Sequence, residues 1–263
     1  MKNILTILVT ILFLIIISWG VYLEFLPEKA TNVNFLYNTG FGLLFAFAGL
    51  VGLFGGFKIG FKSAVGKSLT FLGLAFTSYA IGLFIWTYYN IVLAVEIPSP
   101  SLGDIFYLVL YLPLATMGLW FLISIYTLVI SKRYLLEALA IFIGSCILIF
   151  GLAIQPQLSR EVPLFNNLVN AGYPFTDAVL LALSIIALRA AGGKISQGIL
   201  VLVIGLLIQV IGDIFYSTRV AQELYWNGDI ADKTYTIAAF VISLGMINIL
   251  DKFLPLAANN QKV

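Results

Sequence analysis

The chain has 263 residues and a formal net charge of +2, and it is 61% hydrophobic but only 10% charged. Soluble domains carry about 25% charged residues, so a chain this apolar cannot cover a water-facing surface and is predicted to be an integral membrane protein. The small net charge gives no sign of a nucleic-acid partner, and none is expected. The sequence has no histidine and a single cysteine, which removes the usual ligands of haem, zinc and copper and any disulfide framework. We expect no cofactor.

Apolar segments follow one another along the whole chain, each close to the roughly 20 residues that a helix needs to cross the hydrocarbon core of a bilayer. They are predicted at about 4–22, 35–57, 68–94, 103–130, 134–155, 170–190, 195–218 and 234–256. The first is longer than the apolar core of a secretory signal, and no small-x-small cleavage pattern follows it, so we expect it to be retained. The prediction is an all-α fold: one transmembrane domain (1–263), a bundle of about eight helices that makes a multi-pass protein of the plasma membrane.

The basic residues predict the orientation of these segments. With the N-terminus inside, ten of the fourteen lysines and arginines fall on the inner side and four on the outer side. Because inner loops of membrane proteins carry the excess of Lys and Arg, we expect both termini inside. The acids of the loops are biased toward the outer side.

Two features inside the segments predict how the helices pack. The second segment is rich in glycine, and Ala48 and Gly52 form a small-xxx-small pair that lets two helix backbones approach closely. Pro113 lies well inside the fourth segment and predicts a kink there.

Three aspartates lie in segments that carry almost no other charge. Asp104 and Asp213 belong to identical pentads, Gly-Asp-Ile-Phe-Tyr, at 103–107 (the first pentad) and 212–216 (the second pentad), and Asp177 belongs to a related stretch at 173–177. On the predicted topology the three carboxyl groups lie at similar depth in the outer third of the membrane, beside several tyrosines. The candidate ligand-binding residues are Asp213, Asp177, Asp104, Tyr107, Tyr111, Tyr173 and Tyr216.

Acids at this depth need a reason to be there. A charged side chain in the hydrocarbon core costs about 2.5–3.5 kcal/mol on insertion scales, so such residues face a polar cavity, a partner or each other. Several carboxylates in a low dielectric do not all ionise cheaply without a cation. The constellation therefore predicts an outward-facing pocket of acids and tyrosines for a hard cation, an amine or a proton-linked ligand. Whether a metal ion binds there is left open.

Each acid also has a local structural reading. The spacing from Ser101 to Asp104 fits a Ser-x-x-Asp capping box at a helix start. Asp177 follows Pro174 in a first helical turn, where a negative charge complements the helix dipole. Asp213 lies near the end of its segment, where the dipole disfavours a negative charge, so neither reading explains it.

The aspartates and their neighbours occur in an ordered set of motifs: Pro100-Ser101 with Asp104 and Tyr107, then Tyr173-Pro174 with Asp177, then Asp213 with Tyr216. In this set the chain resembles the multi-span membrane sensor module at the N-terminus of bacterial diguanylate cyclases and of some histidine kinases. The resemblance implies a sensory, ligand-binding domain with no enzymatic activity of its own. Those modules precede a cytoplasmic catalytic domain, whereas this chain ends about seven residues after its last segment. We therefore expect a stand-alone module that acts through a separate signalling protein or membrane complex.

Three other functions remain open from the residues alone. A small transporter or ion-conducting protein would need polar residues that continue inward, and the inner halves of the segments are mostly aliphatic. A structural subunit of a membrane complex would use the glycine-rich second segment as its contact surface. The stretch 101–104 is similar to the Gly-x-Gly-Asp motif of presenilin-type intramembrane aspartyl proteases, but Ser101 replaces the first glycine and the expected order of motifs is not followed.

Overall fold

The computed structural model describes residues 1–98, 100–126, 132–151, 164–191 and 196–260, and these residues form helices and no strand. Two short stretches are π-helical and carry the labels η1 and η2. The elements are α1 (Lys2–Glu24), α2 (Asn32–Phe35), α3 (Tyr37–Ile59), α4 (Ala64–Thr87), η1 (Tyr88–Leu93), α5 (Leu102–Asp104), η2 (Ile105–Tyr111), α6 (Leu112–Ser124), α7 (Lys132–Ile149), α8 (Leu164–Ala191), α9 (Ser196–Ala221) and α10 (Ile230–Asn260).

Within the described residues, seven helical segments are long and apolar enough to cross a membrane, which confirms the prediction of an all-α, multi-pass membrane protein. The predicted segment 134–155 corresponds to α7, whose apolar stretch Leu135–Ile147 is shorter than the others. Parts of three predicted segments (127–130, 152–155 and 195) lie outside the described residues.

Two helices begin earlier than the predicted segments, which followed the apolar runs. Helix α8 begins at Leu164 rather than near 170, and its first turns include the polar residues Asn166 and Asn167. Helix α10 begins at Ile230 rather than near 234, so that Asp232 belongs to its first turn. A helix continues past the apolar part of its sequence wherever its backbone hydrogen bonds continue, so hydropathy alone places such ends too far inward.

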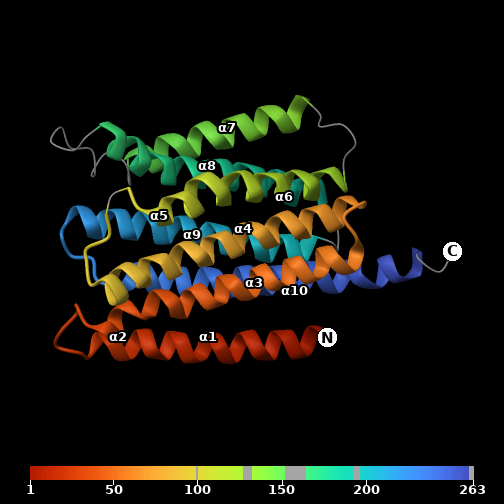
Figure 1. Cartoon of the computed structure of the whole chain (residues 1–263). Helices are drawn as coiled ribbons and strands as arrows, with labels where there is room; N and C mark the ends of the chain where they lie inside the picture. Colours follow the sequence, from red (N-terminus) through yellow and green to blue (C-terminus); the bar gives the residue numbers. More distant parts are fainter. Residues whose placement is uncertain (99, 127–131, 152–163, 192–195, 261–263) are drawn as a thin grey trace.

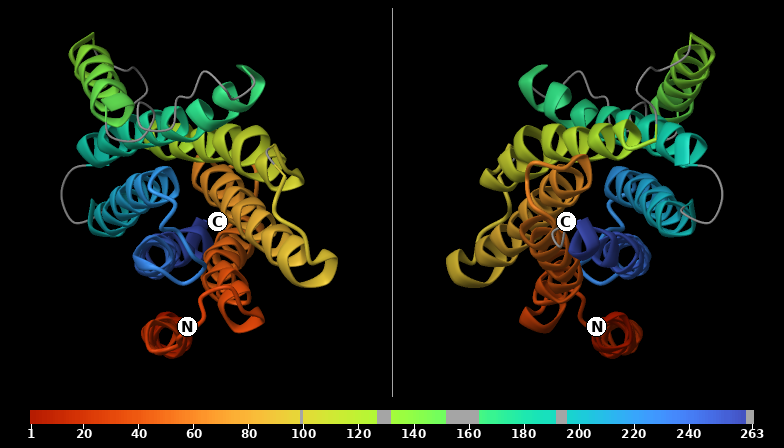
Figure 2. Two further views of the ribbon diagram at one scale, coloured as in Figure 1. Left: turned by 90° about the vertical axis from the view of Figure 1, so that its left-hand side faces the viewer. Right: turned by 90° about the vertical axis from the view of Figure 1, so that its right-hand side faces the viewer.

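Helices α3, α4, α9 and α10 form the centre of the bundle (Figure 1). Helix α3 packs against α4 and α10, and α10 packs against α9. On one side α1 lies against α3 and α10; on the other, α6 contacts α4, α8 contacts both α6 and α9, and α7 contacts α8 (Figure 2). The start of α1 and the end of α10 lie at the same end of the bundle (Figure 1).

The close packing of α3 on α4 comes from glycines. A Cβ atom at Gly73 of α4 would lie 2.6 Å from the backbone nitrogen of Leu53 and 2.9 Å from the carbonyl oxygen of Gly49. One at Gly52 would lie 2.7 Å from the Cα of Gly73, and Ala48 is fully buried. The predicted packing face is confirmed, and it is used within the chain rather than offered to a partner.

Pro113 shapes the approach to the site. It is the second residue of α6, two residues after the last residue of the π-helical η2. Proline cannot donate the i to i−4 hydrogen bond, and its ring crowds the carbonyl four residues earlier, so the wider turns of η2 accommodate it. As a result Tyr107 and Tyr111 of η2 are both buried, with their rings against the ring of Tyr79 on α4.

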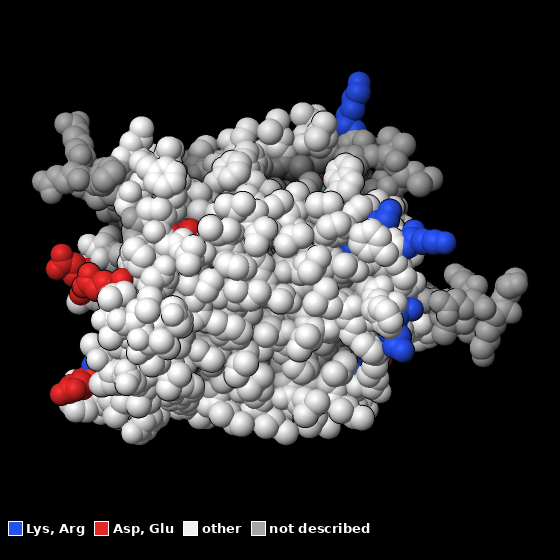
Figure 3. All heavy atoms as spheres, in the orientation of Figure 1, with Lys and Arg blue, Asp and Glu red and all other residues white. Residues whose placement is uncertain are grey.

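The charges separate to the two ends of the bundle (Figure 3). We call the end that carries the α1–α2 connection, with Glu24 and Glu28, the acidic end. The opposite end, which carries the α3–α4 connection with Lys58 and Lys62, is the basic end, and it is also where α1 begins and α10 finishes.

Candidate functional site

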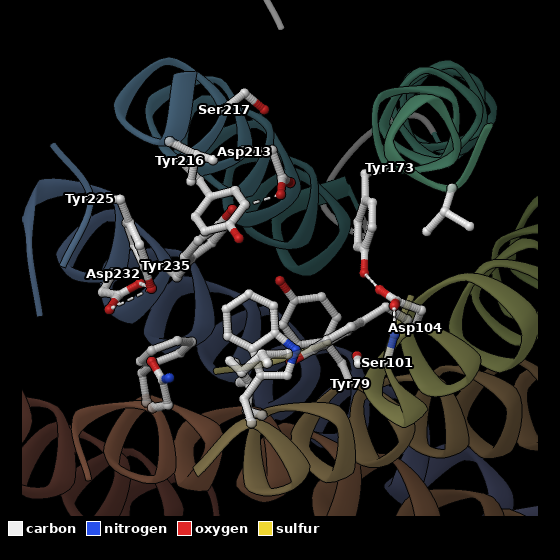
Figure 4. A pocket seen from close by; sticks show the side chains of 18 of the residues that line it. Tyr79, Ser101, Asp104, Tyr173, Asp213, Tyr216, Ser217, Tyr225, Asp232 and Tyr235 are labelled. Carbon is white, nitrogen blue, oxygen red and sulfur yellow. Dashed lines mark hydrogen bonds between the residues drawn. The ribbon is translucent and has the colours of Figure 1, made fainter. Parts of the chain in front are cut away.

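A cavity of about 370 Å³ lies at the acidic end of the bundle. One wall comes from α3, α4, α9 and α10, and the other from the 97–101 connection, α5, η2 and α8 (Figure 4). Its volume is in the range of small-molecule sites. The lining residues are Asn38, Phe41, Tyr79, Leu83, Trp86, Ile97, Pro98, Ser101, Asp104, Tyr107, Val169, Tyr173, Asp213, Tyr216, Ser217, Val220, Tyr225, Asp232 and Tyr235.

The first carboxylate of the cavity, Asp104, is positioned by the start of α5. The Ser101 backbone N–H donates to Asp104 Oδ2 at 2.5 Å, in the capping-box arrangement that the sequence predicts. The Tyr173 hydroxyl, from α8, donates to the other oxygen, Oδ1. The cap therefore explains the position of Asp104, and the bond to Tyr173 joins α5 to α8 within one wall of the cavity.

The second carboxylate, Asp213, lies on α9 eight residues before that helix ends. The Tyr235 hydroxyl, from α10, donates to Asp213 Oδ1 at 2.6 Å. The backbone N–H groups around Asp213 are inside a continuous helix and are used by it. Asp213 therefore relies on a side-chain donor rather than on a helix end.

The third carboxylate, Asp232, is buried in the first turn of α10. The Gly228 N–H donates to its Oδ2 at 2.6 Å, and the Tyr225 hydroxyl lies 3.2 and 3.3 Å from its two oxygens. Both donors come from the connection between α9 and α10. Three aspartate–tyrosine pairs thus border one cavity, and each of them joins two different elements (Figure 4).

No lysine or arginine is among the residues that line the cavity. Two nearby cations are engaged elsewhere: Arg219 pairs with the buried Asp229 at 3.1 Å, and Lys233 pairs with Glu24. Burial raises the pKa of the Asp229 carboxyl, and the Arg219 guanidinium opposes that rise. The donors around the carboxyl groups of the cavity are hydroxyl and amide groups. No basic side chain lines the cavity beside them.

Aromatic rings make up a large part of the cavity wall. Eight of the nineteen lining residues are Phe, Tyr or Trp. The Tyr216 ring lies 4.8 Å from that of Tyr225 and 6.0 Å from that of Trp86, and the Tyr79 ring lies 4.9 Å from that of Tyr107, all measured between centroids. Burial, followed by the nearby Asp232 carboxyl, raises the pKa of the Tyr225 hydroxyl well above its usual range, so this group is a neutral donor.

Five of the seven predicted site residues line the cavity: Asp104, Tyr107, Tyr173, Asp213 and Tyr216. The other two, Asp177 and Tyr111, do not. Each lies one helical turn further from the acidic end than a lining residue, and both are buried. The Asp177 carboxyl lies next to that of Asp213, and the Tyr111 hydroxyl lies next to the Gln209 side chain.

The partner tyrosines are not those adjacent in the sequence. Asp104 bonds to Tyr173 rather than to Tyr107 of its own pentad, and Asp213 bonds to Tyr235 rather than to Tyr216. Residues three apart on a helix share a face, so the tyrosine of each pentad lines the cavity beside its aspartate, while a hydroxyl from a facing helix reaches the carboxylate.

Sequence reasoning missed Tyr79, Tyr225, Asp232 and Tyr235 as site residues. A signal for two of them was present. Asp232 and Tyr235 form a third Asp-x-x-Tyr pattern, with the spacing found inside both pentads. The residues around and between them differ from those of the pentads, so the repeat is not evident when whole pentads are compared. All three carboxylates of the cavity belong to this four-residue pattern.

Within the described ranges, there is no group of three or more His, Cys, Asp or Glu side chains that could hold a metal ion. The three carboxylates of the cavity are spread around its wall instead of converging on one point (Figure 4). The arrangement suits a ligand larger than a single ion.

Comparison with protein-family models, with curated protein sequences and with solved structures gave no match to this chain.

Proposed function

We propose that this protein is a sensory membrane module that binds a small ligand in the cavity at its acidic end and acts on a separate partner protein. The helices cross the plasma membrane about eight times, with both termini inside and the cavity open toward the outside. The common location of the two structured chain ends supports an even number of crossings. The lysines at the basic end support the orientation, because inner loops carry the excess of positive charge.

One observation carries this proposal: three aspartates, each bonded to a tyrosine of another element, surround a cavity of about 370 Å³ in which no basic residue lines the wall. Burying carboxylates among apolar helices costs free energy, so in membrane proteins such residues are typical of functional sites. A purely structural role would be served by pairing them with lysine or arginine. Here the acids face an open space.

The same bonds suggest how binding would be passed on. The cavity separates the four central helices from α5, η2 and α8. Within one wall the Tyr173–Asp104 bond joins α8 to α5, and within the other the Tyr235–Asp213 bond joins α10 to α9. A ligand that competes for these carboxylates changes the contacts that hold each wall together. It thereby favours one packing of the helices over another, and the partner protein binds differently to the two packings.

The experiment is native mass spectrometry of the full chain, purified in mild detergent, as wild type and as Asp213→Asn. The matched control is Asp251→Asn at the basic end, where Asp251 forms only an exposed pair with Lys2 at 3.7 Å. The proposal expects a bound small molecule in the wild type and the control and its loss in Asp213→Asn. Wild-type protein that is free of any ligand and no more heat-stable than Asp213→Asn would contradict it.

A second function, transport, has one observation in its favour. Beneath the cavity, buried side-chain oxygens of Tyr111, Asp177, Ser184 and Gln209 have no hydrogen-bond partner among the described residues. Ser184 lies eleven residues beyond Tyr173 on α8, about 16 Å further along the helix at ~1.5 Å per residue. These groups continue the polar lining toward the basic end. Accumulation of the co-purified ligand in proteoliposomes that contain the protein would favour transport over sensing.

A further inference from the structure

We propose that the ligand of the cavity is an aliphatic diamine or polyamine, that is, an organic cation with more than one ammonium group along an apolar chain. This inference rests on the proposed function, since it names the ligand class of the same site. It is drawn from the number of carboxylates, their separation, the aromatic walls and one buried serine hydroxyl.

The charge of the cavity favours more than one positive group. Asp104, Asp213 and Asp232 line it, and the lining includes no lysine or arginine. A ligand with one charge would leave two carboxylates to be neutralised by protons. A ligand with two or three ammonium groups would compensate them directly, which is the cheaper state for carboxylates in a low dielectric.

The separation of the acids favours an extended ligand. Asp232 with Tyr225 lies on one side of the cavity, Asp104 with Tyr173 lies on the other, and Asp213 lies between them (Figure 4). Each carboxylate has its own tyrosine, so the three do not converge on one cation. A cavity of about 370 Å³ would also leave a single metal ion mostly uncoordinated. Ammonium groups spaced along a chain match acids spaced around a wall.

The walls suit the rest of such a molecule. Ammonium groups are attracted to the faces of Trp and Tyr rings, and methylene groups pack against apolar surface. Trp86, Tyr216 and Tyr235 line the cavity, and Phe41 and Leu83 add apolar wall. A hard metal cation would gain little from these groups, because it prefers several oxygen ligands at close range.

A buried serine hydroxyl provides a second, independent indication. Ser101 lines the cavity and is only 8% exposed, and outside the capping box with the Asp104 backbone its side-chain oxygen makes no hydrogen bond with the described residues. A buried hydroxyl whose hydrogen-bonding capacity is only partly used costs free energy. An ammonium group held by the neighbouring Asp104 carboxylate can donate to this oxygen, because it carries several N–H donors and no acceptor.

The test is thermal unfolding of the purified full chain at fixed ionic strength and neutral pH, titrated with cadaverine, with pentylamine and with calcium chloride. Cadaverine and pentylamine have the same five-carbon chain and differ in one ammonium group. We expect cadaverine to stabilise the wild type at concentrations at least about tenfold lower than pentylamine, and calcium to have no specific effect. Asp104→Asn and Asp232→Asn should each reduce the preference for cadaverine, and Asp251→Asn should not.

Equal potency of cadaverine and pentylamine would overturn the inference, as would stabilisation by calcium alone. In either case, a species that co-purifies with the wild type and is lost in Asp213→Asn would still support the proposed function. Binding of none of the three probes, together with ligand-free wild-type protein, would overturn both. The comparison of two amines on the wild type does not depend on any variant folding, and Tyr173→Phe gives a milder change at Asp104 if Asp104→Asn does not accumulate.

Discussion

The two pentads have the same five residues, occur in different helical contexts and line the same cavity. The first spans α5 and the start of η2, where the chain enters the bundle from the acidic end. The second lies inside α9, where the chain returns toward that end. In both, the glycine is buried, and the aspartate and the tyrosine line the cavity. The same letters therefore place the same side chains on opposite walls of one site.

The pentads differ in how the aspartate is supported. Asp104 accepts a backbone N–H from Ser101 as well as the Tyr173 hydroxyl, since it stands in a first helical turn. Asp213 stands inside a helix and accepts the hydroxyl of Tyr235. Asp104 is thus held by the fold itself, whereas Asp213 depends more on its facing tyrosine and on a ligand.

The largest expected effect is on ligand affinity when each aspartate is neutralised. Truncating one member of a buried charge pair typically costs about 2–5 kcal/mol of binding free energy. Asp213→Asn should fall in this range for cadaverine, measured by isothermal titration. Asp104→Asn should cost less, because backbone donation already disperses part of its negative charge. Equal losses in both variants would remove the distinction between the two pentads.

The next effect is on stability when the facing tyrosine loses its hydroxyl. A hydrogen bond to a charged group contributes about 1.5–3 kcal/mol, and a neutral one about 0.5–1.5 kcal/mol. Tyr235→Phe should lower the unfolding free energy by an amount in the upper range, since it removes the hydroxyl donor to Asp213. Tyr173→Phe should cost about half as much, because Asp104 keeps the Ser101 N–H. Unfolding in detergent, followed by circular dichroism, measures both, and a greater loss in Tyr173→Phe would contradict the comparison.

The pentad glycines provide a third contrast. A Cβ at Gly212 would lie 2.7 and 2.8 Å from ring carbons of Tyr235, whereas a Cβ at Gly103 would lie 3.0 Å from the indole of Trp86. Gly212→Ala must therefore displace the tyrosine that holds Asp213, and overpacking of this kind costs about 1–3 kcal/mol. Gly103→Ala should cost less than about 1 kcal/mol, because alanine also favours the helix. The melting temperatures of the two variants measure this contrast, and Gly212→Ala should have the lower one.

The smallest expected effect lies in the connection between α9 and α10. Burial raises the pKa of Asp229, and Arg219 offsets this by pairing with its carboxylate. The pKa of the Asp229 carboxyl is higher in the folded state than in the unfolded state. Ionisation of this carboxyl therefore lowers the folding stability as the pH rises above the unfolded-state pKa of about 4. Arg219→Gln removes the offset, so it should destabilise by about 1 kcal/mol at neutral pH and by progressively less toward acid pH.

The measurement is the difference in melting temperature between wild type and Arg219→Gln across that pH range. A difference that stays constant, or that grows as the pH falls, would show that Asp229 does not govern the stability of this connection.

Much of the fold could be predicted from the sequence, because the need to cover a membrane-spanning helix with apolar residues leaves a strong signal. The glycine face of α3 could be predicted as well, since small residues four apart have few other uses in a membrane helix. The ends of α8 and α10 could not, because polar residues such as Asn166 and Asp232 continue a helix without continuing its hydropathy.

The site could be predicted in part. The depth of Asp104 and Asp213 followed from counting residues along antiparallel helices, and both line the cavity. The facing tyrosines could not be identified, because the Asp104–Tyr173 and Asp213–Tyr235 pairs depend on which helices are neighbours. Asp177 does not line the cavity: it lies one helical turn further from the acidic end than Tyr173, beside Asp213.

The central claim is that the two pentads bind the ammonium groups of one diamine between them. Equilibrium dialysis of labelled cadaverine against the full chain, as wild type and as the Asp104→Asn/Asp213→Asn double variant, tests it most directly. The account predicts one bound cadaverine per wild-type chain and an affinity reduced by about a hundredfold or more in the double variant. Binding of equal stoichiometry and affinity in the two proteins would contradict it.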